Sequence, residues 1–277
     1  MQPFLAVLGS PVEHSLSPLI HQHALNSIGL KWDYYAIHVP DRERHLLPEL
    51  LKKKGFKGAN VTIPLKEIVP ELVTYVEDEV KYTGAANTIY RDADQWRAAN
   101  TDVYGFAQPL MSRKQALNGK SAVVLGSGGA ARAVCYALTD SLSIKQIFLV
   151  TRNPDKIDYL SYPAADKLKV VSYDQLDTAV VESELVVNTT PVGMYPSTDH
   201  SPVPDNSTHL LNGKICYDLI YNPEKTKFLL QAGEAACEPI SGLKMFIHQA
   251  ARSFEIWTGK EFPAKEAEEL IREKLNG

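Results

Sequence analysis

Apolar and polar residues along the first hundred positions follow the rhythm of alternating strands and helices. Residues 4–8 form a short apolar run, which predicts a buried strand. Ser17 followed by Pro18 predicts a helix start, with the Ser17 hydroxyl as N-cap and proline at the first helical position. Further patterns of the same kind predict strands over residues 34–39 and 58–61 and a helix over residues 42–54. This order of elements indicates a parallel α/β sheet.

The alternation of predicted strands and helices is interrupted near residue 88 and resumes at Lys120. Residues 88–98 hold an Asp-Ala-Asp turn between two strand-like pieces, which predicts a hairpin at the edge of the sheet. A helix over residues 103–117 is expected to link this part to a second α/β unit. That unit and the tail are expected to contain strands at 121–125, 146–150, 185–188 and 214–218 and helices at 130–139, 246–257 and 264–275.

Length and composition set the class of protein. The chain has 277 residues, enough for two domains, and 44% of them are hydrophobic, which excludes intrinsic disorder. The formal net charge of −4 gives no electrostatic footprint for a nucleic acid. No stretch is long and apolar enough for a bilayer span, and the N-terminal run lacks the basic flank of a signal peptide. Three dispersed cysteines, at 135, 216 and 237, fit a reducing compartment and predict no metal site, so we expect a cytoplasmic protein.

A glycine-rich turn follows the strand predicted at residues 121–125. Gly126, Gly128 and Ala131 have the spacing of a dinucleotide-binding turn, in which the glycines allow a tight bend and leave room for a pyrophosphate. The phosphates would then meet free amides at a helix N-terminus. A glycine turn without a ligand is the alternative interpretation.

The end of the next strand bears on the choice of cofactor. An NAD site usually has an acidic residue there, but this chain has Thr151, Arg152 and Asn153, and no acid before Asp155. A guanidinium suits the 2′-phosphate of NADP, because its paired donors match phosphate geometry. The sequence therefore favours NADP over NAD, although an exposed loop arginine is the plainer alternative.

Polar side chains gather in the loops of the first hundred residues. Loops after parallel strands form the ligand crevice of an open α/β sheet, so we expect the side chains that follow the first and third strands to share one crevice. Hydroxyls and amides with few charges suit a substrate that carries several hydroxyl groups. Each residue also has a plain structural alternative, as a cap, a loop support or a solvated lysine. The candidates are Ser15, Ser17, Asn60, Thr62, Lys66, Asn87, Thr88, Asn100, Thr101 and Asp102.

These segments resemble the shikimate dehydrogenase family. The similarity runs in order along nearly the whole chain, through S-L-S-P at residue 15, N-V-T-I-P-L-K at 60, G-A-A-N-T at 84, N-T-D-V-Y-G-F at 100, G-S-G-G-A-A-R-A at 126, N-T-T-P-V-G-M at 188, Y-D-L-I-Y-N-P at 217 and G-L-K-M-F-I-H-Q-A at 242. So many motifs in order make chance similarity negligible. The sequence departs slightly at residues 151–153, where the family often has Asn-Arg-Thr.

The resemblance implies NADPH-dependent, reversible reduction of 3-dehydroshikimate to shikimate, in the pathway to chorismate and the aromatic amino acids. It implies an N-terminal α/β substrate domain with a mostly parallel sheet, a Rossmann-type NADP-binding domain, and C-terminal helices that return to the first domain. We place the domains at residues 1–103 with 245–277, and at residues 104–244. A monomer or a homodimer is expected, with a small-molecule substrate and no nucleic-acid or membrane partner.

The resemblance also assigns roles to residues. Lys66 and Asp102 match the family's catalytic pair: the Lys66 ammonium would stabilise the oxygen of the ketone, and Asp102 would hold that ammonium in place. The implied substrate contacts are Ser15, Ser17, Asn60, Thr62, Asn87, Tyr221 and Gln249. The implied cofactor contacts are Gly126, Ser127, Gly128, Gly129, Ala130, Thr151, Arg152, Asn153, Thr189, Gly193, Leu219, Gly242 and Met245.

Two alternatives to this function stay open at the level of the sequence. One is a quinate/shikimate dehydrogenase that uses NAD, against which Arg152 and the paired Ser15 and Ser17 argue. The other is a non-catalytic nucleotide-binding regulator of the same fold, against which the presence of both Lys66 and Asp102 argues.

Overall fold

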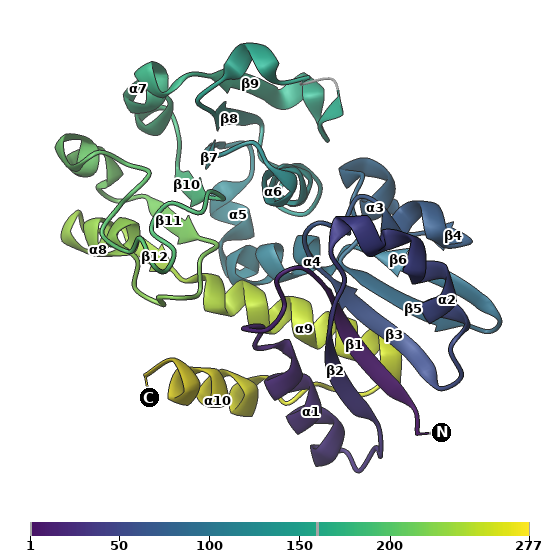
Figure 1. Ribbon diagram of the computed structural model, residues 1–277. Helices are drawn as coiled ribbons and strands as arrows, with labels where there is room; N and C mark the ends of the chain where they lie inside the picture. The colour runs from purple at the N-terminus through teal and green to yellow at the C-terminus, as the bar shows by residue number, and fades with distance from the viewer. Residues whose placement is uncertain (1, 159–160, 277) are drawn as a thin grey trace. The chain divides into compact units, whose positions relative to one another are not determined.

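The computed structural model describes residues 2–158 and 161–276. The chain forms two compact units, Met1–Thr101 with Ile247–Gly277, and Asp102–Phe246 (Figure 1). The C-terminal residues thus belong to the first unit. No helix of the described chain is long and apolar enough to cross a membrane.

The first unit is built on a six-stranded mixed sheet in the order β2-β1-β3-β5-β6-β4. Strand β1 (Phe4–Gly9), second from one edge, pairs in parallel with β2 (Asp33–His38) and β3 (Phe56–Val61). β5 (Thr88–Asp92) and β6 (Gln95–Ala99) form the predicted antiparallel hairpin. The hairpin is not at the edge as predicted, because the two-residue strand β4 (Tyr75–Val76) pairs with β6 and takes that place. A strand of two residues is too short to leave a recognisable pattern of apolar and polar positions in the sequence.

Helices cover both faces of this sheet (Figure 1). Leu47, Leu50 and Leu51 pack against the core face that includes Phe4 and Leu8. The opposite side carries His21, which packs against Tyr34 and against aromatic side chains near the C-terminus. The helices of this unit are α1 (Ser17–Ser27), α2 (Leu47–Lys52), α3 (Asp78–Thr83), the C-terminal part of α9 (Gly242–Thr258), and α10 (Ala264–Asn276).

Prolines shorten two of the predicted helices. The helix predicted over residues 42–54 is a 3₁₀ turn, Asp41–Leu46, followed by α2, which begins beside Pro48. The helix predicted over 103–117 is likewise divided at Pro109 into α4 (Thr101–Ala107), a 3₁₀ segment and α5 (Lys114–Leu117). Proline lacks the N–H of a helix interior, so each proline is tolerated only in a first turn.

The predicted N-cap role of Ser17 is wrong. Leu16 is the N-cap residue of α1, and it makes no side-chain capping bond. Instead, the Ser17 N–H donates to Oγ of Ser15 at 3.3 Å.

The second unit holds a fully parallel sheet in the order β12-β11-β10-β7-β8-β9, which is the doubly wound Rossmann arrangement. The predicted fold class is thus confirmed. Chain order reverses between β7 and β10, and ligands bind beside such a switch point. The strands are β7 (Ser121–Leu125), β8 (Gln146–Val150), β9 (Leu168–Val171), β10 (Leu185–Asn188), β11 (Ile215–Asp218) and β12 (Glu238–Ile240); β9 and β12 were not predicted.

Helices bury both faces of this second sheet. Along β7, Ala122 and Val124 enter one apolar cluster while Val123 and Leu125 enter the other. Strands buried on both sides are nearly continuous in apolar residues, which is why β7 reads as an unbroken run. The helices are α4 and α5, given above, with α6 (Gly129–Asp140), α7 (Leu176–Val181) and α8 (Lys227–Glu234).

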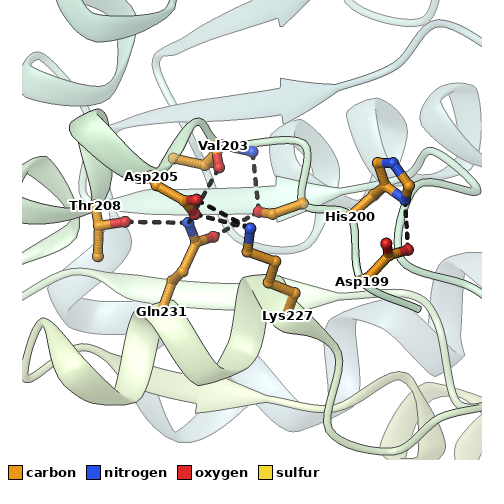
Figure 2. A network of polar contacts seen from close by, with 8 residues as sticks. Asp199, His200, Val203, Asp205, Thr208, Lys227 and Gln231 are labelled. Carbon is orange, nitrogen blue, oxygen red and sulfur yellow. Dashed lines mark hydrogen bonds and ion pairs between the residues drawn. The ribbon is translucent and has the colours of Figure 1, made fainter. Parts of the chain in front are cut away.

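A polar network fastens the long segment before β11 to helix α8. Figure 2 shows Gln231 and Lys227 of α8 reaching the same carboxylate, Asp205. Gln231 Nε2 donates to Asp205 Oδ1 at 2.8 Å, and Lys227 Nζ lies 3.0 Å from that oxygen. The nearby pair of His200 and Asp199 stands apart from these contacts (Figure 2). The network fixes the course of the chain that follows Gly193.

Candidate active site

The first unit brings the loop after β1 against the loop after β3. A Cβ on Gly9 would lie 2.3 Å from Thr62 Cγ2, so only glycine permits this approach. Two backbone bonds join the loops: Thr62 N–H donates to the Leu8 carbonyl, and Ser10 N–H donates to the Ile63 carbonyl, each at 2.8 Å. Thr62 and the loop that carries Ser15 are therefore neighbours, as expected for two sides of one crevice.

A chain of buried polar groups starts at Ser17. Its side chain lies next to the phenol of Tyr34, and the Tyr34 hydroxyl donates to Asn60 Oδ1 at 2.7 Å. Burial raises the pKa of Tyr34 well above 10, so the phenol keeps its proton. The Asn60 amide nitrogen donates to Ser253 Oγ at 3.0 Å. Asn60 thus has protein partners at both ends of its amide.

Lys66 and Asn87 are tied together through the backbone. The Lys66 carbonyl accepts a bond from Ala86 N–H at 2.8 Å, directly before Asn87. Lys66 is half-buried, whereas the side chain of Asn87 is buried and its Oδ1 accepts from the N–H of Thr101 at 2.7 Å. Thr101 is the first residue of α4, and Asp102 follows it directly. Gln249 lies buried on α9, where its carbonyl accepts from Ser253.

In the second unit the glycine turn has the shape expected of a phosphate cradle. Gly126 has a φ of +102°, and a Cβ there would come within 3.0 Å of side-chain atoms of Thr189 and Thr190. Gly128 is the N-cap of α6, and a Cβ on Gly128 or Gly129 would meet nothing within 4 Å. This open side leaves room for a phosphate against the backbone at the start of the helix.

Residues after β8 border the same turn. Thr151 is buried, and its Oγ1 lies 3.2 Å from Oγ of Ser127. Arg152 and Asn153 are exposed. Burial raises the pKa of Tyr173, and the charge of Arg152 partly opposes that rise. A cation at this position suits a 2′-phosphate next to an adenine ribose.

The ends of β10 and β11 are joined by a buried carboxylate that sequence reasoning did not single out. Asp218 accepts hydrogen bonds from Asn188 Nδ2, from Ile220 N–H and from the hydroxyl of Thr226, at 2.6 to 3.0 Å. Burial raises the pKa of Asp218 to about 6. Asn188 in turn accepts from Thr190, which borders Gly126. A lone acid at the end of an apolar strand was the available signal.

The remaining predicted cofactor residues lie around the end of β11. Leu219 N–H donates to the Asn188 carbonyl at 3.0 Å, and a Cβ on Gly242 would lie 2.2 Å from the Leu219 carbonyl oxygen. Gly242 therefore lets α9 begin directly against this loop. Tyr221 stacks on Phe246 with ring centroids 4.8 Å apart, and burial raises its pKa.

Three more residues that are expected to contact the cofactor lie in the second unit. Gly193 is buried in the loop after β10, with a φ of +96°. Thr189 donates its hydroxyl to the Leu125 carbonyl at 2.7 Å. Met245 packs against the apolar cluster that contains Ala122. Within residues 2–158 and 161–276, no group of three or more His, Cys, Asp or Glu side chains is placed to hold a metal ion.

Comparison with known proteins places this geometry in a family. The family model "Shikimate dehydrogenase substrate binding domain" matches residues 7–89, and "Shikimate 5'-dehydrogenase C-terminal domain" matches residues 242–272. The chain is 37% identical over 265 residues to the shikimate dehydrogenase (NADP(+)) of Synechocystis sp., covering 94% of this chain and 91% of that protein. The chain belongs to the shikimate dehydrogenase family. The resemblance noted in the sequence is thus confirmed.

Solved structures of shikimate dehydrogenases and their relatives superpose on the whole chain. Shikimate 5-dehydrogenase from Thermus thermophilus, in complex with NADP(H) and shikimate, is 34% identical with a TM-score of 0.84, covering 98% of this chain and 99% of that one. Quinate dehydrogenase from Corynebacterium glutamicum, in complex with NAD, is 26% identical with a TM-score of 0.88, covering 98% and 99%. The fold alone therefore does not separate shikimate from quinate, or NADP from NAD.

Proposed function

We infer that this chain is an NADP-dependent shikimate dehydrogenase, which reversibly reduces 3-dehydroshikimate to shikimate in the pathway to chorismate and the aromatic amino acids. The observation that carries this inference is the match over nearly the whole chain to relatives named shikimate dehydrogenase (NADP(+)). The arginine after β8, in place of an acidic residue, agrees with the cofactor of those relatives.

Lys66 and Asp102 are the residues to which we assign the chemistry. When bound, NADPH supplies the hydride that reduces the ketone. Negative charge then grows on the ketone oxygen, where the Lys66 ammonium stabilises it and donates the proton. Asp102 orients that ammonium, and it accepts a hydrogen bond from a substrate hydroxyl. The backbone bond between Lys66 and Ala86 supports this assignment, because it fixes the lysine beside Asn87.

The loops of the first unit are proposed to bind the substrate. Ser15, Ser17, Thr62, Asn87 and Gln249 would contact its carboxylate and hydroxyls, mostly through neutral groups. Tyr221 is proposed as a substrate contact from the family resemblance alone. Asn60 shares the buried polar region, but its amide already bonds to Tyr34 and Ser253, so we assign it a supporting role.

The second unit is proposed to bind NADP. The pyrophosphate would rest on the turn from Gly126 to Ala130, where Gly128 and Gly129 have open space beside them. Arg152 would pair with the 2′-phosphate, flanked by Thr151 and Asn153. The nicotinamide end would lie against the loops that contain Thr189, Gly193, Leu219, Gly242 and Met245.

The localisation, the oligomeric state and the domain limits of the protein are also proposals. We propose a cytoplasmic enzyme, on the ground that its cysteines are unpaired and buried. A monomer or a homodimer suffices, because each chain carries both sets of residues. The substrate-binding domain is taken as residues 1–103 with 245–277 and the NADP-binding domain as residues 104–244, beside the observed unit limits at 101/102 and 246/247.

An absorbance assay at 340 nm tests the function. Purified protein is given shikimate or quinate with NADP⁺ or NAD⁺ in all four combinations. Shikimate with NADP⁺ is expected to give the fastest reduction of cofactor. Faster reaction with quinate and NAD⁺ would indicate a quinate/shikimate dehydrogenase, and no reaction in any combination would leave a nucleotide-binding regulator.

A further inference from the structure

Five buried polar side chains of the first unit form one cluster, of which the proposed function assigns a substrate contact only to Asn87. They are at most 6% exposed, and they come from four elements that are far apart in the sequence: β3, the start of β5, the start of α4, and α9. A polar cluster in a core is costly unless every member is hydrogen-bonded. The five residues, called the hydroxyl–amide cluster below, are Asn60, Asn87, Thr88, Thr101 and Ser253.

The cluster determines which way the Asn87 amide faces. Asn87 Oδ1 lies 2.7 Å from the backbone nitrogen of Thr101. A backbone N–H can only donate, so the atom facing it must be the carbonyl oxygen of the amide. The hydroxyls of Thr88 and Thr101 donate to the same oxygen at 3.0 and 3.1 Å. Turning the amide over would set its NH₂ against the Thr101 N–H, donor against donor.

Ser253 connects these hydroxyls to Asn60. Its Oγ lies 2.8 Å from Thr88 Oγ1 and 3.0 Å from Thr101 Oγ1, and it accepts from Asn60 Nδ2 at 3.0 Å. One direction of donation satisfies the row: Asn60 donates to Ser253, Ser253 to Thr88, and Thr88 to Asn87. Ser253 shares its proton with the Gln249 carbonyl at 3.0 Å, one turn earlier on α9.

We propose that Thr88 and Ser253 are positioning residues for the substrate, because they hold the carbonyl of Asn87 inward. Asn87 then meets the substrate only as a hydrogen-bond donor, through Nδ2. A hydroxyl or carbonyl oxygen of the substrate satisfies that donor, whereas a donor-only group such as an ammonium does not. This proposal rests on the proposed function, in which Asn87 contacts shikimate.

Steady-state kinetics with NADP⁺ and shikimate on the full-length protein test the positioning role. Thr88→Val and Ser253→Ala each remove one hydroxyl and are expected to raise the shikimate KM two- to ten-fold, with the NADP⁺ KM within two-fold of wild type. Thr88→Ser keeps the hydroxyl and is expected to restore the shikimate KM. Thr258→Val is the matched control, since this hydroxyl at the end of α9 bonds outside the cluster: it donates to the Phe254 carbonyl at 2.7 Å and accepts from the Lys260 N–H at 3.1 Å. Equal effects of Thr88→Val and Thr88→Ser on the shikimate KM would overturn the proposal.

A second variant tests the orientation of the amide itself. In Asn87→Asp the carboxylate still accepts all three donors, so the thermal unfolding midpoint should stay within a few degrees of wild type. The donor to the substrate is lost, so the shikimate KM should rise at least a hundred-fold. A large fall in the midpoint would overturn the assigned orientation. If wild-type protein does not turn over shikimate, the proposed function fails, while the unfolding comparison still tests the orientation.

Discussion

Lys66 is the single residue on which the proposed chemistry depends most. Its charge matters chiefly when negative charge has built up on the ketone oxygen, so it acts mainly in the transition state. Lys66→Ala is therefore expected to lower kcat by roughly 10²–10⁴-fold, the usual range for a positioned acid-base group. The shikimate KM should change much less, because the hydroxyl and amide contacts remain.

The control for Lys66 is Lys57→Ala, which removes an exposed lysine from the other end of β3. Steady-state kinetics on both variants, with circular dichroism to confirm folding, give the comparison. If Lys66→Ala kept a kcat within about two-fold of wild type, as an ordinary surface change does, Lys66 would have no part in the mechanism.

Arg152 carries the choice of cofactor. A charge-assisted contact to the 2′-phosphate is worth about 1.5–3 kcal/mol, so Arg152→Ala should raise the KM for NADPH ten-fold or more. The KM for NADH should hardly change, because NADH lacks that phosphate. Both constants come from initial rates with 3-dehydroshikimate. An equal loss with both cofactors would show that Arg152 supports the loop rather than the phosphate.

His21 makes the stability of the protein depend on pH. It is fully buried among aromatic rings, and burial lowers its pKa from 6.5 to about 3. The native state keeps this imidazole neutral while the unfolded chain protonates it below pH 6.5. Stability from this residue is therefore complete above pH 6.5 and falls by about 1.4 kcal/mol per pH unit below it.

His21→Phe removes that dependence and keeps an aromatic ring. Urea unfolding at pH 7.5 and pH 5 should show wild type losing roughly 2 kcal/mol more than the variant over this interval. His45→Gln, an exposed histidine on the 3₁₀ turn before α2, serves as the control and should follow wild type. Parallel losses in wild type and His21→Phe would contradict the account.

At the scale of elements, the turn between β7 and α6 offers a substitution that should change cofactor binding without changing the stability of the fold. Gly128 has open space where a Cβ would lie and a φ of −85°, so Gly128→Ala should fold with little change in unfolding temperature. That methyl group would occupy the room proposed for the pyrophosphate, so NADPH binding should weaken at least ten-fold.

Fluorescence titration with NADPH measures the effect of Gly128→Ala on binding. Gly233→Ala, in helix α8 and also with open space around its Cβ, is the matched control and should leave NADPH binding unchanged. Unchanged affinity in Gly128→Ala would place the phosphates elsewhere.

Strongly patterned elements of the fold could be predicted from the sequence, and weakly patterned ones could not. The buried strands β1 and β7 are nearly continuous apolar runs, so their positions follow from the local sequence pattern. Pro48 and Pro109 mark where two predicted helices are interrupted, and the apolar periodicity around them hid that effect. β4 has only two residues, so its place at the sheet edge depends on pairing with β6.

The candidate site shows the same division. Gly126, Arg152 and the loop polar residues could be found because their types and spacings suit a ligand. Ser253 could not, since its importance comes from partners that only the fold brings together, and for Asp218 the one signal was its place as a lone acid at the end of an apolar strand. Ser253 bonds to Asn60, 193 positions earlier in the chain, and no local pattern reports such a contact.

At the scale of the whole molecule, one chain supplies two kinds of binding unit. The first unit presents neutral hydroxyls and amides, and the second presents a glycine turn at the N-terminus of α6 beside the switch point of a parallel sheet. The order of the units along the chain was implied by the family resemblance, because neither composition nor periodicity reports it. Together the two units match the needs of an enzyme that takes a polyol acid and a phosphorylated dinucleotide.

The most direct test of this account is the ratio of kcat/KM for NADP⁺ over NAD⁺ with shikimate as substrate, measured on wild-type protein at one pH. Pairing of Arg152 with the 2′-phosphate predicts a ratio of at least ten, on the order of 1.5 kcal/mol or more. The same measurement with quinate should give a much lower kcat/KM than shikimate for either cofactor. A ratio near or below one, or faster turnover of quinate, would contradict the assignment of an NADP-dependent shikimate dehydrogenase.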